Sequence, residues 1–257
     1  MGGGVGTSES AGARLGPVDV AVLIPALDEE RSLGAVLAEL PRAGEGGAAR
    51  GAAGFRVREV VVVDNGSSDR TAEVARAGGA TVIDEPRRGY GAACLAGLGY
   101  LRRDPPAVVV FLDADHSDDP GELPQVLAPI LAGRADLVIG SRALGARERG
   151  SLTPAQEVGN HVAAGLLRAL FGTRTTDLGP FRAIRWPGLE SLRMRDRDFG
   201  WTVEMQARAA RAHLAVAEVP VRYRRRIGRS KISGTLRGAT AAAWKILTTI
   251  ARVRLGG

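Results

Sequence analysis

The sequence is poor in the residues that hold small secreted domains together and in those that stack on nucleic acid bases. It has one cysteine, Cys94, in 257 residues, which excludes an internal disulfide framework and a zinc site built from several cysteines. Aromatic residues make up 4% of the chain, which is sparse for proteins that stack single-stranded bases on aromatic rings. The composition therefore argues against a disulfide-rich scaffold and against a stacking nucleic acid binder.

Long apolar runs are absent as well. No run reaches the roughly 18 residues that a transmembrane helix needs. Residues 1–16 are polar and rich in glycine, without the apolar core of a signal peptide, so we expect a disordered tail there. These absences predict a cytoplasmic protein, and they leave peripheral attachment to the inner face of the cell membrane open.

The chain has enough apolar residues for a large core, and its charge is unevenly distributed. Hydrophobic residues make up 45% of it and charged residues 25%, which suits one sizeable α/β domain. Residues 1–140 carry 13 basic and 20 acidic residues, whereas residues 141–257 carry 22 basic and 8 acidic residues. A basic half is typical of proteins that bind phosphate groups, and nucleic acid is the alternative partner that this charge suggests.

Short apolar strands alternate with helical segments along the first half of the chain. The patterns predict strands at 18–27, 59–63, 81–83, 107–112 and 137–139, and helices at 29–40, 71–77, 91–101 and 123–131. The second half is less regular, with helices predicted at 155–171, 203–213 and 234–254, and strands at 181–184 and 215–223. Continuously apolar strands that alternate with helices indicate an α/β fold with a mostly parallel sheet covered on both faces.

Polar clusters follow three of these strands, at 64–69, 113–119 and 141–142. In an open parallel sheet, ligands bind at the carboxyl ends of the strands. Asp113 and Asp115 flank Ala114 at one such end, and a pair of carboxylates there can hold a hard divalent cation such as Mg²⁺. The structural alternative is an acidic turn that caps the helix beginning near Pro120.

A second candidate binding element is the basic stretch 222–231, which holds six cations in ten residues. Arginine can grip a phosphate with two parallel hydrogen bonds, and lysine acts as a compact charge, so the stretch is a candidate phosphate clamp. The alternative is a solvated surface. Two turns, at 25–29 and 64–69, have a similar ambiguity, because their carboxylates either bind a nucleoside or cap the helix that follows.

Six motifs occur along roughly residues 18 to 235, in the order VLIPALDEE, VVVVDNGSSDRTAEV, FLDADHSDDP, VIGSR, TDLGPFRA and RRIGRSK. Motifs in this order resemble those of family-2 glycosyltransferases, and in particular those of polyprenyl-phosphate sugar transferases such as the dolichyl-phosphate mannose and glucose synthases. The resemblance implies a GT-A fold, which is a Rossmann-like, mostly parallel sheet with helices on both faces. It also implies a catalytic domain at 17–235, divided into a nucleotide-binding half at 17–140 and an acceptor half at 141–235. The apolar stripe in the residues that follow predicts an amphipathic C-terminal helix at 236–257.

The resemblance assigns roles to individual positions. Residues that would contact the nucleotide-sugar are Pro25, Leu27, Glu29, Asp64, Asn65, Asp113, Ala114 and Arg142. The metal, Mg²⁺ or Mn²⁺, would be held by Asp115 with Ser117 at the second ligand position. Residues that match positions for donor or acceptor phosphates are Arg142, Arg225, Ser230 and Lys231, and the implied catalytic set is Asp113, Asp115, Arg225 and Lys231.

The implied reaction is the inverting, metal-dependent transfer of a hexose from GDP-mannose or UDP-glucose to a polyprenyl phosphate at a membrane surface. A phosphate acceptor is already anionic at neutral pH, whereas a soluble or glycan hydroxyl acceptor needs a carboxylate base. Asp177 and Glu204 are the candidate bases, and for Glu204 the alternative is a helical ion pair with Arg208. A nucleic acid binder or scaffold without enzymatic activity is the remaining alternative.

Overall fold

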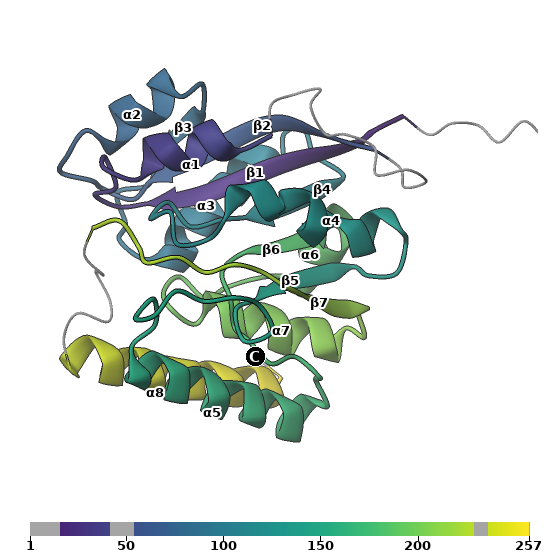
Figure 1. Ribbon diagram of the computed structural model, residues 1–257. Coiled ribbons are helices and arrows are strands. Elements are labelled where there is room, and N and C mark those ends of the chain that lie inside the picture. The colour runs from purple at the N-terminus through teal and green to yellow at the C-terminus, as the bar shows by residue number, and fades with distance from the viewer. Residues whose placement is uncertain (1–15, 42–53, 229–235, 257) are drawn as a thin grey trace, which may run out of the picture.

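The computed structural model describes residues 16–41, 54–228 and 236–256. The predicted tail at 1–16 falls almost wholly outside these residues, and so do the phosphate-site candidates Ser230 and Lys231. Within the described residues, strands and helices alternate along the first half of the chain as predicted (Figure 1).

The strands lie close to the predicted positions. They are β1 (Val18–Ala26), β2 (Phe55–Asp64), β3 (Thr81–Asp84), β4 (Val108–Phe111), β5 (Leu137–Ser141), β6 (Arg182–Arg185) and β7 (Val216–Pro220). The helices are α1 (Leu33–Glu39), α2 (Thr71–Ala77), α3 (Tyr90–Leu101), α4 (Leu123–Leu131), α5 (Pro154–Phe171), α6 (Trp186–Leu192), α7 (Trp201–Arg211) and α8 (Leu236–Arg254).

The strands form one seven-stranded sheet in the order β3-β2-β1-β4-β6-β5-β7. Strand β1 is central, and its Val22 lies between Val60 of β2 and Val110 of β4 in parallel register. Strand β6 runs antiparallel to both β4 and β5, so the sheet is mixed but mostly parallel. Because β6 is reversed, its first residue, Arg182, lies at the same edge of the sheet as the carboxyl ends of the parallel strands.

Both faces of the sheet are covered, as continuously apolar strands predict. One core lies between the sheet and helices α1, α2 and α4, and it takes alternate β1 residues such as Val20 and Val22. The other core lies between the sheet and helices α3, α6 and α7, and it takes Ala21 and Leu23 from the same strand. A third cluster joins α5, α7 and α8 and buries Leu167, Val203 and Ile250.

Two features of the fold differ from the sequence expectation. Helix α6 was not predicted, because a seven-residue segment with Pro187 and Gly188 in its first turn has little helical periodicity. Helix α1 begins at Leu33 rather than at residue 29, because the residues before it form hydrogen-bonded turns. Glu29 therefore belongs to the loop at the sheet edge and not to a helix.

Candidate active site

The loops that follow β1 and β2 are joined by hydrogen bonds between their backbones and side chains. The Asp28 amide donates to the Ser67 hydroxyl at 2.9 Å, and Asp28 Oδ1 accepts from the Ser68 amide at 2.7 Å. Asp28 has a φ of 52°, a left-handed conformation that aspartate tolerates better than most residues. The Glu29 amide donates to Thr71 Oγ1 at 2.7 Å, so the predicted nucleotide-binding turns form one rigid edge.

Asn65, which was predicted to lie near the base, uses its amide to hold the backbone that follows β3. Its Nδ2 donates to the carbonyls of Glu85 and Arg87 at 2.9 and 2.8 Å. Its Oδ1 accepts from the Gly89 amide at 2.8 Å. Asn65 therefore orders the entry to α3, while the neighbouring Asp64 accepts from the Ser67 amide at 2.9 Å.

Asp115 is a buried carboxylate in the loop that follows β4. Its Oδ1 accepts hydrogen bonds from both the amide and the hydroxyl of Ser117, at 2.9 and 2.5 Å. Its Oδ2 is in an ion pair with the guanidinium of Arg226. Arg226 is thus paired with the carboxylate that was predicted to bind a metal, and the hydrogen bonds from Ser117 orient that carboxylate.

Asp118 is buried beside this ion pair, and Asp113 is half-buried with its Oδ1 shielded from solvent. Neither Asp118 oxygen, nor Oδ1 of Asp113, has a hydrogen-bond partner of ordinary geometry among the described residues. Burial, together with the charge of Asp113, raises the pKa of Asp118 to about 8. Burial also raises the pKa of Asp113, although Arg226 partly offsets it. Buried carboxylates without partners are expensive, so this arrangement is typical of a site that receives a cation or a hydrogen-bond donor.

A second buried ion pair lies at the end of β5. Arg142 Nε and Nη2 donate to the two carboxylate oxygens of Asp177 at 2.9 and 2.6 Å, and the Arg142 amide donates to Oδ2 at 2.6 Å. The guanidinium also lies 5.0 Å from the centre of the Tyr223 ring. Burial opposes both charges, but the pairing outweighs it, so the pKa of Asp177 is lowered and that of Arg142 is raised.

Glu204 has a structural role in the scaffold. Its carboxylate accepts from the amide of Asp196 at 2.7 Å, from the amide of Arg195, and from Nε of Arg208 at 2.8 Å. The helical pair with Arg208 is therefore the alternative that the geometry favours over a catalytic base. Asp177 is also occupied, because both of its oxygens hold Arg142.

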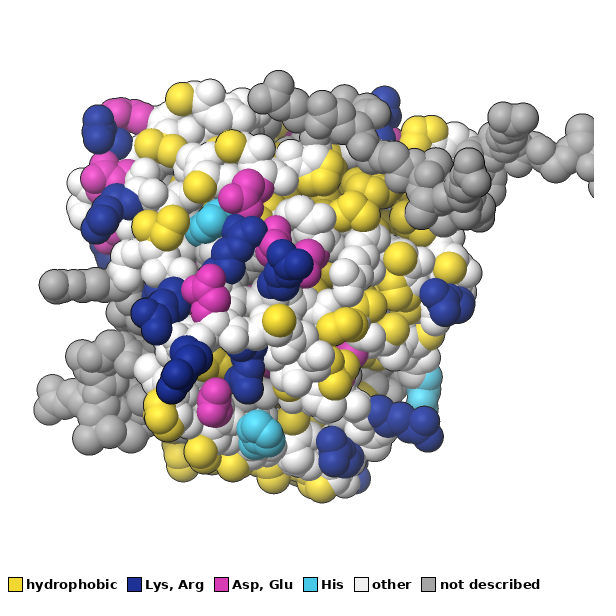
Figure 2. All heavy atoms as spheres, in the orientation of Figure 1, with side chains coloured by type: hydrophobic (Ala, Val, Ile, Leu, Met, Phe, Trp, Pro, Cys, Tyr) yellow, Lys and Arg dark blue, Asp and Glu magenta, His cyan; other side chains and the backbone are white. Residues whose placement is uncertain are grey.

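The basic segment 222–228 lies along the acidic loop 113–119. The Arg224 amide donates to the Ser117 carbonyl at 2.7 Å, and the Ile227 amide donates to the Asp115 carbonyl at 2.9 Å. Arg224 pairs with Asp119 at 2.8 Å, which fixes the two segments together. On the face in Figure 2, basic and acidic side chains are interleaved accordingly.

Arg225 is directed differently from its neighbours. Its Nε donates to the Arg149 carbonyl at 2.6 Å, and its amide donates to Glu148 Oε2 at 2.8 Å. Arg226, rather than Arg225, therefore contacts the carboxylate at 115. The phosphate role that the resemblance gives to Arg225 stays a prediction, and the contact between Arg226 and Asp115 is one that the sequence did not indicate.

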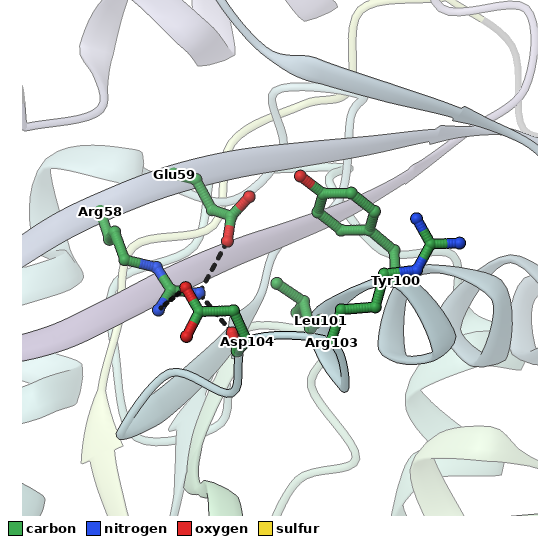
Figure 3. Close-up of a pocket in the computed structure, with 6 residues that line it drawn as sticks. All are labelled: Arg58, Glu59, Tyr100, Leu101, Arg103 and Asp104. Carbon is green, nitrogen blue, oxygen red and sulfur yellow. Dashed lines mark hydrogen bonds and ion pairs between the residues drawn. The ribbon is translucent and has the colours of Figure 1, made fainter.

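A cavity of about 350 Å³ lies elsewhere, lined by Arg58, Glu59, Tyr100, Leu101, Arg103 and Asp104 (Figure 3). Arg58 pairs there with Glu59 at 2.9 Å and with Asp104 at 3.1 Å, so its charge is already compensated. The Ala107 amide, just before β4, donates a hydrogen bond to the Asp19 carbonyl near the start of β1. Asp104 is three residues before Ala107, so its side of the cavity lies at the amino ends of the strands. Parallel sheets bind their ligands at the opposite edge, so we assign the cavity no role.

Comparison with known protein families agrees with the geometry. The model of glycosyl transferase family 2 matches residues 21–195, which include most of β1 and the whole acidic loop 113–119. The chain belongs to this family. This family 2 glycosyltransferase has the doubly wound, mixed sheet of the GT-A fold, as the motifs implied.

Several relatives of this glycosyltransferase are similar over most of their length. An uncharacterized glycosyltransferase of Mycobacterium tuberculosis is 41% identical over 234 residues, covering 89% of this chain and 98% of the relative. A dolichyl-phosphate hexose transferase of Haloferax volcanii is 35% identical, covering 86% and 90%. A polyprenol monophosphomannose synthase of Mycolicibacterium smegmatis is 32% identical, covering 76% and 79%.

Among solved structures, the glycosyltransferase resembles glucosyl-3-phosphoglycerate synthase from Mycobacterium tuberculosis, in a complex with Mn²⁺, UDP-glucose and phosphoglyceric acid. The TM-score is 0.71, and the match covers 92% of this chain and 80% of that one. At 24% identity this likeness concerns the fold. In the part of the glycosyltransferase that the structure describes, no helix combines the length and apolar content required to cross a bilayer.

Two residues of the site lie in stretches noted in the sequence but were not singled out there. Tyr223, which lies against Arg142, and the buried Arg182 became apparent only when β6 and the basic segment were placed in space. Arg182 donates to the carbonyls of Leu178 and Gly179, and burial lowers its pKa to about 10. Asp118 did have a signal, because it belongs to a cluster of four carboxylates within seven residues.

Proposed function

We propose that this glycosyltransferase transfers a hexose from a nucleotide-sugar, GDP-mannose or UDP-glucose, to a polyprenyl phosphate, with inversion at the anomeric carbon. The observation that carries the proposal is the contact between the acidic loop 113–119 and the basic segment 222–228 at the carboxyl edge of the sheet. A site that sets carboxylates against several arginines suits substrates that bring phosphates on both sides of the reacting bond.

The atoms of the proposed reaction balance without a protein base. An anionic oxygen of the acceptor phosphate forms a bond to the anomeric carbon, and the bond from that carbon to the nucleoside diphosphate breaks. The leaving nucleoside diphosphate takes the electron pair, and arginines of the 222–228 segment stabilise its charge. Both candidate bases, Asp177 and Glu204, are engaged in buried ion pairs, which supports a phosphate acceptor over a hydroxyl acceptor.

The residues present suit a divalent cation, Mg²⁺ or Mn²⁺. Asp115 is a hard oxygen ligand that already attracts a cationic group, and the partnerless oxygens of Asp113 and Asp118 lie in the same loop. No cluster of three or more acidic, histidine or cysteine residues able to hold a metal occurs among the described residues, and one or two carboxylates suffice when substrate phosphates complete the shell. Bound there by Asp115, such an ion would offset negative charge on the donor diphosphate.

Arg226 and a cation compete for the same carboxylate oxygen in this arrangement. We expect Arg226→Gln to raise the affinity for Mn²⁺ in the absence of nucleotide about tenfold, because one charge-assisted hydrogen bond to Asp115 no longer has to be broken. A titration of Mn²⁺ followed by electron paramagnetic resonance measures this. Arg225→Gln is the control, since Arg225 contacts the Arg149 carbonyl instead. Equal affinities in the two variants would contradict the competition.

The acceptor is tested by measuring nucleoside diphosphate release. The purified chain is incubated with GDP-mannose or UDP-glucose and Mg²⁺, together with a polyprenyl phosphate, phosphoglyceric acid or a glycan. We expect release, and a glycolipid product, only with polyprenyl phosphate. Turnover with phosphoglyceric acid or the glycan alone would replace the lipid acceptor by a soluble one. A lipid acceptor would also place the enzyme peripherally on a membrane, and we propose the inner face of the cell membrane.

A further inference from the structure

Helices α5 and α8 expose large apolar side chains. Val158 and Val162 of α5 are 63% and 53% exposed, and Trp244 and Leu255 at the α8 end of the chain are 70% and 87% exposed. Single exposed apolar residues are normal on a soluble protein, whereas several on adjacent elements mark an interaction surface. We call this surface the apolar face and define it as Val158, Val162, Leu170, Trp244, Leu247 and Leu255.

The apolar face exists because α5 is apolar on two sides. Ala163 and Leu167 point inward and pack in the cluster shared with α7 and α8. Val158 and Val162, four residues apart, lie together on the outward side. A surface helix normally carries polar residues on its outer side, and on α5 Val158 and Val162 are exposed there together with His161 and Arg168.

Helix α8 repeats the pattern. Ile250 and Val253 are buried in the shared cluster, whereas Trp244 and Leu247 of α8, and Leu255 just after its end, follow helical spacing on the outer side. The two helices are neighbours in this cluster and lie at the same end of the molecule in Figure 1. In Figure 2, apolar side chains border this end of the molecule.

The charges on these helices indicate which partner covers the apolar face. The sequences of α5 and α8 contain one acidic residue, Glu157, and it pairs with Arg147 at 3.0 Å. Exposed arginines border the apolar residues, at Arg168, Arg252 and Arg254. Apolar residues with a tryptophan and a cationic border suit an anionic lipid surface, where rings and aliphatic stems enter the interface and arginines meet lipid phosphates. A second copy of the chain would instead bring cationic borders together.

The apolar face is also close to the proposed acceptor site along the chain. Residues 229–235 alone separate the basic segment 222–228 from the start of α8. Helix α8 is held to the domain by Lys245, which pairs with both Asp196 and Asp198 at 3.2 Å. A membrane that contacts α8 would therefore meet the element that follows, in sequence, the segment that would receive a lipid phosphate.

We infer that the apolar face docks on an anionic lipid bilayer. Trp244, Val158 and Val162 enter the headgroup boundary, while the bordering arginines bind lipid phosphates. Docking would bring a membrane-embedded lipid phosphate to the basic segment. This last step rests on the proposed function, whereas the docking itself does not. The partner is thus a lipid surface rather than a protein.

Cosedimentation with vesicles tests the inference on the full chain. The vesicles consist of phosphatidylcholine alone or of phosphatidylcholine with phosphatidylglycerol. We expect binding to the anionic vesicles that weakens with added salt, and at least a tenfold loss of partitioning in Val162→Glu and in Trp244→Glu. The control is Ala77→Glu, which places the same charge on an exposed position of α2. Wild-type binding by both face variants, or no binding by the wild type, would overturn the inference.

Two further measurements separate this inference from its competitors. Sedimentation velocity gives the mass of each variant, and a wild-type dimer that Val162→Glu converts to a monomer would assign the apolar face to a second copy instead. Turnover on a water-soluble, short-chain prenyl phosphate should be equal in wild type and Trp244→Glu, because that acceptor needs no bilayer. Vesicle binding without any sugar transfer would support the docking surface while contradicting the proposed function.

Discussion

Replacing Asp115 by asparagine should lower kcat/KM for nucleoside diphosphate release about 10²–10³-fold, because the site loses the negative charge that would hold a cation against the donor diphosphate. In the wild type the Ser117 amide donates a hydrogen bond to Asp115 Oδ1 at 2.9 Å. The asparagine oxygen can accept the same hydrogen bond, so the loop should keep its shape. The measurement is steady-state release with GDP-mannose or UDP-glucose, Mg²⁺ and polyprenyl phosphate. The melting temperature should stay close to that of the wild type, since Arg226 is partly exposed to solvent.

The same substitution at Asp104 is the matched control. Asp104 is an exposed aspartate that also pairs with an arginine, Arg58, but it lies near the amino ends of the strands. Asp104→Asn should therefore turn over like the wild type. Full activity in Asp115→Asn would exclude this carboxylate from the chemistry. It would favour the alternative that Asp113 and Asp115 belong to an acidic turn that caps the helix beginning near Pro120.

The strand ends show how much of the site could be predicted from the sequence. Apolar runs that stop at Asp64 and Asp113 located two loops of this sheet edge correctly. A parallel strand that is covered on both faces is apolar along its length, so the first polar residues mark the point where the chain leaves the sheet. The contact between residues 113–119 and 222–228 could not be predicted in the same way. It depends on the reversal of β6 and on the return of the chain through β7, and neither has a local sequence signal.

The roles of individual side chains were harder to predict than their positions. Glu204 and Asp177 have the chemistry of bases, but the structure engages both with arginines, at Arg208 and Arg142. Helical spacing made the first pairing foreseeable. The second joins residues that are 35 positions apart, so it appears only once β5 and the loop before β6 are packed together.

Breaking the Arg142–Asp177 ion pair should lower stability more than the loss of any other ion pair in the described site. We expect Asp177→Asn to lower the free energy of unfolding by about 3–5 kcal/mol, because the buried Arg142 guanidinium would lose its counter-charge. For a domain of this size the corresponding loss of melting temperature is about 10 °C. Thermal unfolding followed by circular dichroism at neutral pH measures it, with Asp19→Asn as the control, since the Asp19–Arg56 pair is exposed and worth at most about 1 kcal/mol.

The pH dependence of this stability difference shows whether it comes from the charge of Asp177 or from a change in packing. Because pairing holds the pKa of Asp177 below its unfolded value, the contribution of the carboxylate is fully present above that unfolded value, about 3.9. It is lost as the pH falls through the lower, folded pKa, where the carboxylate takes up a proton. The stability difference between wild type and Asp177→Asn should therefore be constant at neutral pH and shrink in strong acid. A difference that persists unchanged through that range would mean that asparagine disturbs packing rather than charge.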